Sequence, residues 1–115
     1  MSWWVSIEAE DLIHECPNCG GHERDIDFEV NITFNVARML MRAGIHPKVL
    51  NDMTVEKALP IVKNGYALLN DLPEYFTQFD AVNGWGTVET TLDAIRDFLN
   101  VLEHGSHPLD KVRWV

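Results

Sequence analysis

Residues 25–34 alternate strictly between polar and apolar side chains, and this pattern limits the fold more than any other part of the sequence. Successive side chains of a β-strand point to opposite faces of a sheet, so the segment is predicted to be a strand that is buried on one face only. The side chains expected to face the core are Ile26, Phe28, Val30, Ile32 and Phe34. Such a strand needs a pairing partner and a second layer that covers its apolar face.

Two segments near the ends of the sequence alternate in a similar way. Apolar side chains occupy every second position from Trp3 to Ala9, and residues 111–115 alternate as well. We predict that the first segment pairs antiparallel with residues 25–34. The last segment is expected to form a third strand at one edge of the sheet.

Segments with helical spacing lie between the predicted strands. Residues 36–43 are expected to form a short helix, which is ended by Gly44 and by Pro47 shortly after it. Thr54 is expected to be the N-cap of a longer helix, whose apolar residues recur every three or four positions. Pro60 lies inside this helix and should either kink it or separate its first turns.

Two further helices are expected in the second half of the chain. A short one should span residues 72–76, since proline is favoured in a first helical turn. Thr87 should begin the clearest amphipathic helix, which His104 and Gly105 end. Its apolar face would consist of Val88, Leu92, Ile95, Phe98, Leu99 and Leu102. These patterns predict one α+β domain over residues 1–115, in which a small antiparallel sheet (an N-terminal hairpin plus a C-terminal strand) packs on three or four α-helices.

The formal net charge of −9 is concentrated at the start of the sequence. Residues 1–29 contain eight acidic side chains and one basic side chain, whereas the rest of the chain is nearly balanced. An acidic surface argues against direct binding to nucleic acids, whose phosphates need basic partners. It fits a solvated acidic face, a surface for a basic protein partner, or mimicry of a nucleic acid.

The sequence has no apolar run of about 20 residues, which a membrane-spanning helix needs, and its first residues do not resemble a secretion signal. We therefore expect a cytoplasmic protein that does not enter a membrane. In a reducing cytoplasm, two closely spaced cysteines favour metal binding over a disulfide.

Cys16 and Cys19 form a Cys-x-x-Cys pair in a turn that is followed by two glycines. Such a turn directs two thiolates to one point, and a structural zinc site needs four ligands. His22 and His14 flank the turn and are the expected third and fourth ligands. The more distant histidines are His46, His104 and His107. Two alternatives stay open: an ordinary turn with free thiols, and a redox pair, which is less favoured because a strand rather than a helix follows.

Two polar motifs form a second candidate site. Its predicted ligand-binding residues are Asn31, Thr33, Asn35, Asn83, Trp85 and Thr87. The first three are spaced by two and would share one face of a strand, and the last three lie in a glycine-containing loop before a helix. Amides, a ring for stacking and a helix start that favours anions would suit a small ligand resembling a nucleotide or a sugar. Alternatively, these side chains only cap helices, hold turns and fill the core.

With Asn-Ile-Thr-x-Asn at 31–35 and Asn-Gly-Trp-Gly at 83–86, the chain resembles a family of small proteins encoded by bacteriophages, prophages and bacteria, often actinobacteria. The resemblance extends from about Trp3 to the C-terminus, and residues 2–5 also match some members. It implies a phage setting, and hence the host cytoplasm, and a shared site at the two motifs, but no particular activity. The Cys-x-x-Cys turn lies outside the pattern of that family.

These observations favour a small non-enzymatic binding protein of phage type, with a polar pocket for a small, nucleotide-like ligand and a structural zinc site. The sequence has no glycine-rich phosphate loop followed by lysine, and no serine in a nucleophile-elbow context. The main alternative is an acidic interaction or inhibitor protein that binds a basic protein of the host. A zinc hydrolase is a weaker third hypothesis. In each case we expect a monomer or a small homo-oligomer.

Native mass spectrometry of the freshly purified protein tests the zinc site. We expect the native mass to exceed the denatured mass by one zinc ion per chain, because structural sites hold their metal tightly. Equal native and denatured masses would contradict the site and would leave Cys16 and Cys19 in an ordinary turn.

Overall fold

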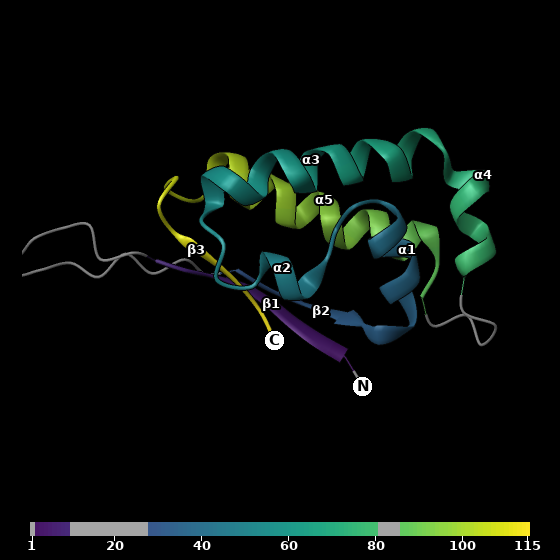
Figure 1. Cartoon of the computed structure of the whole chain (residues 1–115), viewed down its shortest axis with the longest axis horizontal. Coiled ribbons are helices and arrows are strands. Elements are labelled where there is room, and N and C mark those ends of the chain that lie inside the picture. The colour runs from purple at the N-terminus through teal and green to yellow at the C-terminus, as the bar shows by residue number, and fades with distance from the viewer. Residues whose placement is uncertain (1, 10–27, 81–85) are drawn as a thin grey trace, which may run out of the picture.

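The described residues contain one antiparallel sheet of three strands (Figure 1), in the order β2–β1–β3. The computed structural model describes residues 2–9, 28–80 and 86–115, and the strands in it are β1 (Ser2–Glu8), β2 (Glu29–Thr33) and β3 (Lys111–Trp114). β1 is central and pairs antiparallel with both neighbours. This confirms the small α+β fold, with the N-terminal strand pair and the C-terminal strand at one edge of the sheet.

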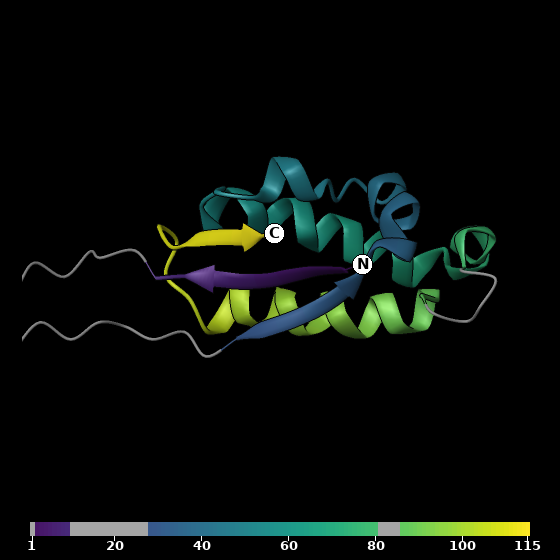
Figure 2. The same cartoon turned by 90° about the horizontal axis from the view of Figure 1, so that it is seen from below.

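In the described part of the chain, five α-helices and two 3-10 helices accompany the sheet. In chain order they are η1 (Phe34–Val36), α1 (Ala37–Arg42), α2 (Pro47–Leu50), α3 (Val55–Asp71), α4 (Pro73–Phe76), η2 (Thr77–Phe79) and α5 (Val88–His104). The long helices α3 and α5 lie side by side on one face of the sheet, with α5 against β2 and α3 and α2 against β3 (Figure 2). Among the described residues, no helix has the length and apolar composition needed to cross a membrane.

The two faces of the sheet differ sharply. The buried residues of the inner face are Val5, Ile7, Ile32, Val112 and Trp114. On the outer face Trp4 lies opposite Asn31 and is 51% exposed. No described element covers that outer face (Figure 2).

β2 is shorter than the alternating pattern predicts. The strand ends at Thr33, because the Thr33 hydroxyl accepts a hydrogen bond from the Asn35 N–H at 3.3 Å and thereby caps η1. The prediction that Phe34 faces the core is therefore wrong. The side chain is 39% exposed, and its ring centroid lies 4.4 Å from that of Trp3. Ile26 lies outside the described residues. Phe28 is partly buried against the core and directly precedes the strand.

The N-terminus of α3 is capped by the backbone of a distant segment. Thr54 occupies the predicted N-cap position, but its hydroxyl is buried without a hydrogen-bond partner among the described residues. The Val55 N–H donates to the Asp110 carbonyl at 2.7 Å, and the Glu56 N–H donates to the Pro108 carbonyl at 3.0 Å. Pro60 does not divide the helix, which continues from residue 55 to 71.

The other helix ends largely follow the predictions. Gly44 adopts a φ of +86° just beyond α1, and Thr87 caps α5, whose last residue is His104. The sequence pattern does not predict α2: Pro47 is expected only to end the preceding helix, whereas it is the first residue of α2.

Gly65 lets α3 approach the turn after α1 closely. A Cβ atom at this position would lie 2.6 Å from two side-chain carbons of Ile45 and 3.0 Å from the Ala43 carbonyl oxygen. Ile45 is fully buried and has little room to move. The absence of a side chain at position 65 therefore sets the distance between these segments.

The Gly65→Ala substitution tests this packing. We expect the unfolding free energy to fall by about 1–3 kcal/mol through overpacking, although alanine is the better helix former by about 1 kcal/mol. Chemical denaturation measures the difference. The matched control is Asn64→Ala, at an exposed position of the same helix, which should be neutral or slightly stabilising. A Gly65→Ala variant as stable as this control would contradict the prediction.

Candidate functional site

Four of the six predicted ligand-binding residues lie in the described part of the chain. Asn31 and Thr33 belong to β2, Asn35 belongs to η1, and Thr87 is the N-cap of α5. Asn35 is therefore not on the strand face that its spacing predicts. Asn83 and Trp85 lie outside the described residues.

The two motifs meet at Gly86. A Cβ atom at this glycine would lie 2.9 Å from Cγ1 of Val36, 3.2 Å from Cβ of Asn35 and 3.3 Å from Cγ2 of Thr33. Gly86 also has a φ of +129°, which side-chain-bearing residues rarely adopt. The contact therefore requires glycine, and it brings the start of α5 against the end of β2.

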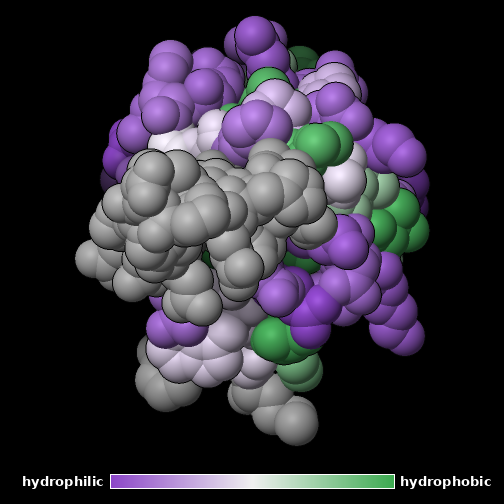
Figure 3. All heavy atoms as spheres, turned by 90° about the vertical axis from the view of Figure 1, so that its left-hand side faces the viewer, coloured by the Kyte–Doolittle hydropathy of each residue, from purple (hydrophilic) through white to green (hydrophobic). Residues whose placement is uncertain are grey.

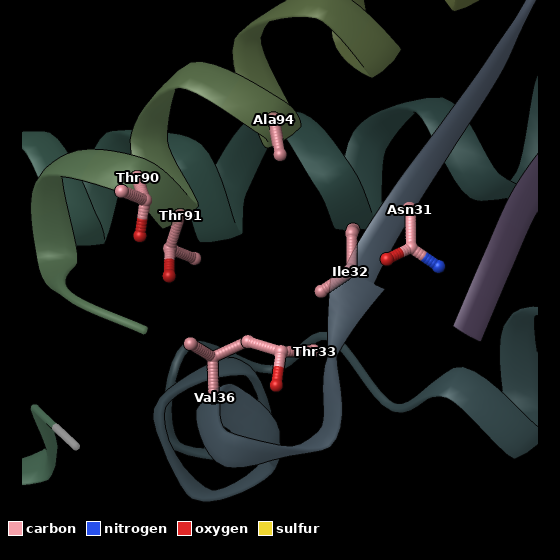
Figure 4. Close-up of a pocket in the computed structure, with 7 residues that line it drawn as sticks. All are labelled: Asn31, Ile32, Thr33, Val36, Thr90, Thr91 and Ala94. Atoms are coloured by element: carbon pink, nitrogen blue, oxygen red, sulfur yellow. The ribbon is translucent and has the colours of Figure 1, made fainter. Parts of the chain in front are cut away.

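A small cavity lies next to this contact, between β2 and α5 (Figure 4). Its volume is about 90 Å³, and its lining residues are Asn31, Ile32, Thr33, Val36, Thr90, Thr91 and Ala94. Thr90, Thr91 and Ala94 point from α5 toward the opposite wall (Figure 4). The cavity is much smaller than the roughly 300–1,000 Å³ of a site that encloses a whole ligand.

The Asn31 amide is turned away from the cavity, toward β1 (Figure 4). Its Nδ2 donates to the Ser2 hydroxyl at 2.8 Å and to the Trp3 carbonyl at 3.0 Å. These bonds join the end of β2 to the start of β1. The amide thus has a structural role at the sheet edge.

The hydroxyls of α5 are used mainly for capping. Thr87 Oγ1 accepts from the Thr90 N–H at 3.2 Å, and Thr90 Oγ1 accepts from the Thr87 N–H at 3.0 Å, which forms a capping box. The Thr91 hydroxyl donates to the Thr87 carbonyl at 2.8 Å and is only 3% exposed. Since a hydroxyl has one donor and two acceptor positions, Thr91 Oγ1 retains acceptor capacity on the cavity side.

The start of α5 already holds a carboxylate. Asp80 Oδ1 accepts the Val88 N–H at 2.9 Å, and Glu89 lies in the first turn. Two carboxylates satisfy the preference of a helix N-terminus for negative charge. A phosphate group at this point would be repelled, so the predicted preference of this helix start for an anionic ligand finds no support here.

The cavity also contains residues that sequence analysis missed. Thr90, Thr91 and Ala94 follow Thr87 at helical spacings that place them near the cap. The available signal was the polar Thr91, which lies on the otherwise apolar face of α5 between Val88 and Ile95.

The four predicted zinc ligands, Cys16, Cys19, His22 and His14, lie outside the described residues. That segment joins the paired strands β1 and β2, and the described surface at this end of the molecule is mainly hydrophilic (Figure 3). Among the described residues, no group of three or more histidine, cysteine or acidic side chains is placed to hold a metal. The zinc site therefore stays a prediction.

The more distant histidines lie at helix ends or shortly after the end of α5. His46 is the N-cap residue of α2, and Nε2 of His104 lies 3.7 Å from a Glu103 carboxylate oxygen. Nδ1 of His107 accepts the Leu109 N–H at 3.2 Å, and the backbone N–H of His107 donates to the carboxylate of the buried Asp110 at 2.7 Å.

The open face of the sheet is balanced in charge where it is described. The register places Glu8 and Glu29 there together with Lys111 and Arg113. Arg113 also lies 3.7 Å from Glu8. The sequence predicts the acidic residues 1–29 as a surface for a basic partner, and the other acids of this segment, Asp25 and Asp27 among them, lie outside the described residues.

No protein-family model, curated protein or solved structure matches the chain.

The Thr87 capping box can be tested through stability. Thr87→Ala should lower the unfolding free energy by about 1 kcal/mol, because the Thr90 N–H loses its acceptor. Thr87→Ser keeps the hydroxyl and should retain most of that stability. Thermal or chemical denaturation compares the two variants, and equal losses would show that the hydroxyl is not the stabilising group.

Proposed function

We propose that this chain is a small non-enzymatic binding protein, which holds a polar group of its ligand in the cavity between β2 and α5. The observation that carries the proposal is the contact of Gly86 with Thr33, Asn35 and Val36. It joins two motifs that are about fifty residues apart in the sequence, and a cavity with buried hydroxyl oxygen lies beside it.

The chemistry of the cavity favours a hydrogen-bond donor. The Thr91 hydroxyl donates its hydrogen to the Thr87 carbonyl, so its oxygen can still accept a hydrogen bond from an N–H or O–H of a ligand. Ile32, Val36 and Ala94 supply apolar walls. The carboxylates of Asp80 and Glu89 disfavour an anion at the nearby helix start.

The volume limits how much of the ligand enters. A cavity of about 90 Å³ has room for about three water molecules at roughly 30 Å³ each. A hydroxyl, amino or amide group would fit, while the rest of the ligand would lie outside. Amino groups of nucleosides and hydroxyl groups of sugars have this chemistry, which agrees with the base or sugar part of the nucleotide-like ligand expected from the two motifs, but not with its phosphate. The phage setting rests on the motif resemblance alone.

Titration of the isotope-labelled protein with neutral nucleosides and monosaccharides tests the proposal by NMR. We expect a binder to shift the backbone amide signals of Thr33, Thr90 and Thr91. Ala94→Leu should abolish these shifts, because the larger side chain fills the cavity. Unlike a change at Asn31 or Thr87, it breaks no hydrogen bond that the structure uses.

The matched control is Asn100→Leu, which adds a leucine at an exposed position of the same helix outside this cavity. It should bind the ligand as the unchanged protein does, and both variants should show the melting cooperativity of a folded protein. Absence of any binder among these compounds would overturn the proposal. So would a folded Ala94→Leu variant that binds with unchanged affinity.

A further inference from the structure

The chain contains an acid-free stretch, which is unusual in a protein of net charge −9. Residues 30–51 carry three basic side chains, Arg38, Arg42 and Lys48, and no acidic one. All three are exposed, on α1 and α2. This part of the surface is therefore cationic, although the remainder of the chain is strongly acidic.

Arg38 and Arg42 have no acidic partner among the described residues. They are four residues apart on α1, so their side chains are neighbours on one face of the helix. By contrast, Arg96 lies 3.3 Å from the Asp93 carboxylate. Two adjacent guanidinium groups repel each other, and an anion bound between them would convert this repulsion into attraction.

These arginines line a hollow between α1 and η2, which we call the α1–η2 hollow. Its lining residues are Arg38, Met41, Arg42 and Phe79, and its volume is about 530 Å³. This volume falls within the roughly 300–1,000 Å³ of small-molecule sites. The hollow thus combines two cations with a thioether and an aromatic ring.

The apolar part of the hollow is held in place by neighbouring rings. The Phe79 ring centroid lies 6.0 Å from that of Tyr75 and 6.4 Å from that of Phe76, which is buried. Met41 is 46% exposed and leaves its side chain available to a ligand. A thioether beside an aromatic ring is a favourable surface for flat apolar groups.

Two other hollows on the described surface have the opposite charge. One, of about 480 Å³, is lined by Glu29 and Asp97, and another, of about 380 Å³, is lined by Asp80 and Glu89. Neither contains a basic side chain. Local charge therefore distinguishes the α1–η2 hollow from cavities of similar size.

We propose that the α1–η2 hollow binds a small amphipathic anion: a phosphate or carboxylate that is attached to an aromatic or other apolar group. Arginine forms paired hydrogen bonds with such oxyanions, and the Met41 and Phe79 side chains would contact the apolar part. Nucleic acids and anionic membranes are excluded as occupants, because the acidic remainder of the protein repels extended polyanions. The site does not depend on the cavity of the proposed function, which other residues form.

Phenyl phosphate is a minimal probe of this chemistry. In an NMR titration it should shift the side-chain Nε–H signals of Arg38 and Arg42, the Met41 methyl signal and the Phe79 ring signals. Inorganic phosphate lacks the apolar part and should bind more weakly, and raised salt should weaken both. Mapping on the unchanged protein requires no variant to fold.

Three single variants then separate local from general charge effects. Arg38→Gln and Arg42→Gln should each weaken phenyl phosphate binding by about ten-fold, as expected for loss of one charge-assisted contact. Arg96→Gln removes the same charge elsewhere and should leave the affinity unchanged. Ala94→Leu should also leave it unchanged, so that failure here and failure of the proposed function are distinguishable.

Three results would overturn the proposal that the α1–η2 hollow binds a small amphipathic anion. It fails if phenyl phosphate at millimolar concentrations shifts none of these signals, or if inorganic phosphate binds as tightly as phenyl phosphate. It also fails if Arg96→Gln weakens binding as much as the two α1 variants do.

Discussion

The position of β1 at the centre of the sheet is the constraint on which the rest of the structure depends. This strand is hydrogen-bonded to β2 on one side and to β3 on the other, so it joins the two ends of the described chain. Val5 and Ile7 point inward and are buried, while Trp4 points outward. A shift of one residue in register would exchange the two faces. Burial of the inner face against α3 and α5 therefore fixes the register, in which Thr33, the last residue of β2, lies opposite Ser2.

The end of β2 decides how the two polar motifs meet. Since Thr33 caps η1, the chain turns there and presents Val36 and Asn35 to Gly86. Several motif side chains are already explained by structure, because Asn31 bridges the strands and Thr87 caps α5. The alternative interpretation as caps and turns thus accounts for part of the pattern. The buried acceptor of Thr91 beside the cavity is not explained by capping, so the proposed binding rests on the cavity rather than on the amides.

Local patterns predicted much of the fold. Alternation identified all three strands, and the helical period with Thr87 and Gly105 gave the limits of α5. The failures arose where a distant segment replaces a local interaction. The hydroxyl of Thr54 was expected to cap α3, but the carbonyls of Pro108 and Asp110 occupy that role, and a contact between residues more than fifty positions apart has no local signal. The prediction for Phe34 was wrong because of a local interaction: the hydroxyl of the preceding Thr33 caps η1 and ends the strand one residue early.

The sequence predicts the residues on only one wall of the cavity, because the other wall again depends on a distant segment. Spacing can place Asn31 and Thr33 on a strand, but it cannot show that Thr91 and Ala94 lie opposite them, since that depends on how α5 crosses β2. The sequence shows both the acidic start of the chain and the acid-free residues 30–51. It does not show that Arg38 and Arg42 line a hollow together with Phe79 of η2, because that depends on how α1 and η2 are placed relative to each other. Arg38 and Arg42, which have no acidic partner among the described residues, attract an anion only within one Debye length, about 8–10 Å. A long polyanion would also come within this distance of carboxylates elsewhere on a protein of net charge −9. The same distribution of charge that weakens binding of any large polyanion therefore confines anion recognition to ligands small enough to fit between α1 and η2.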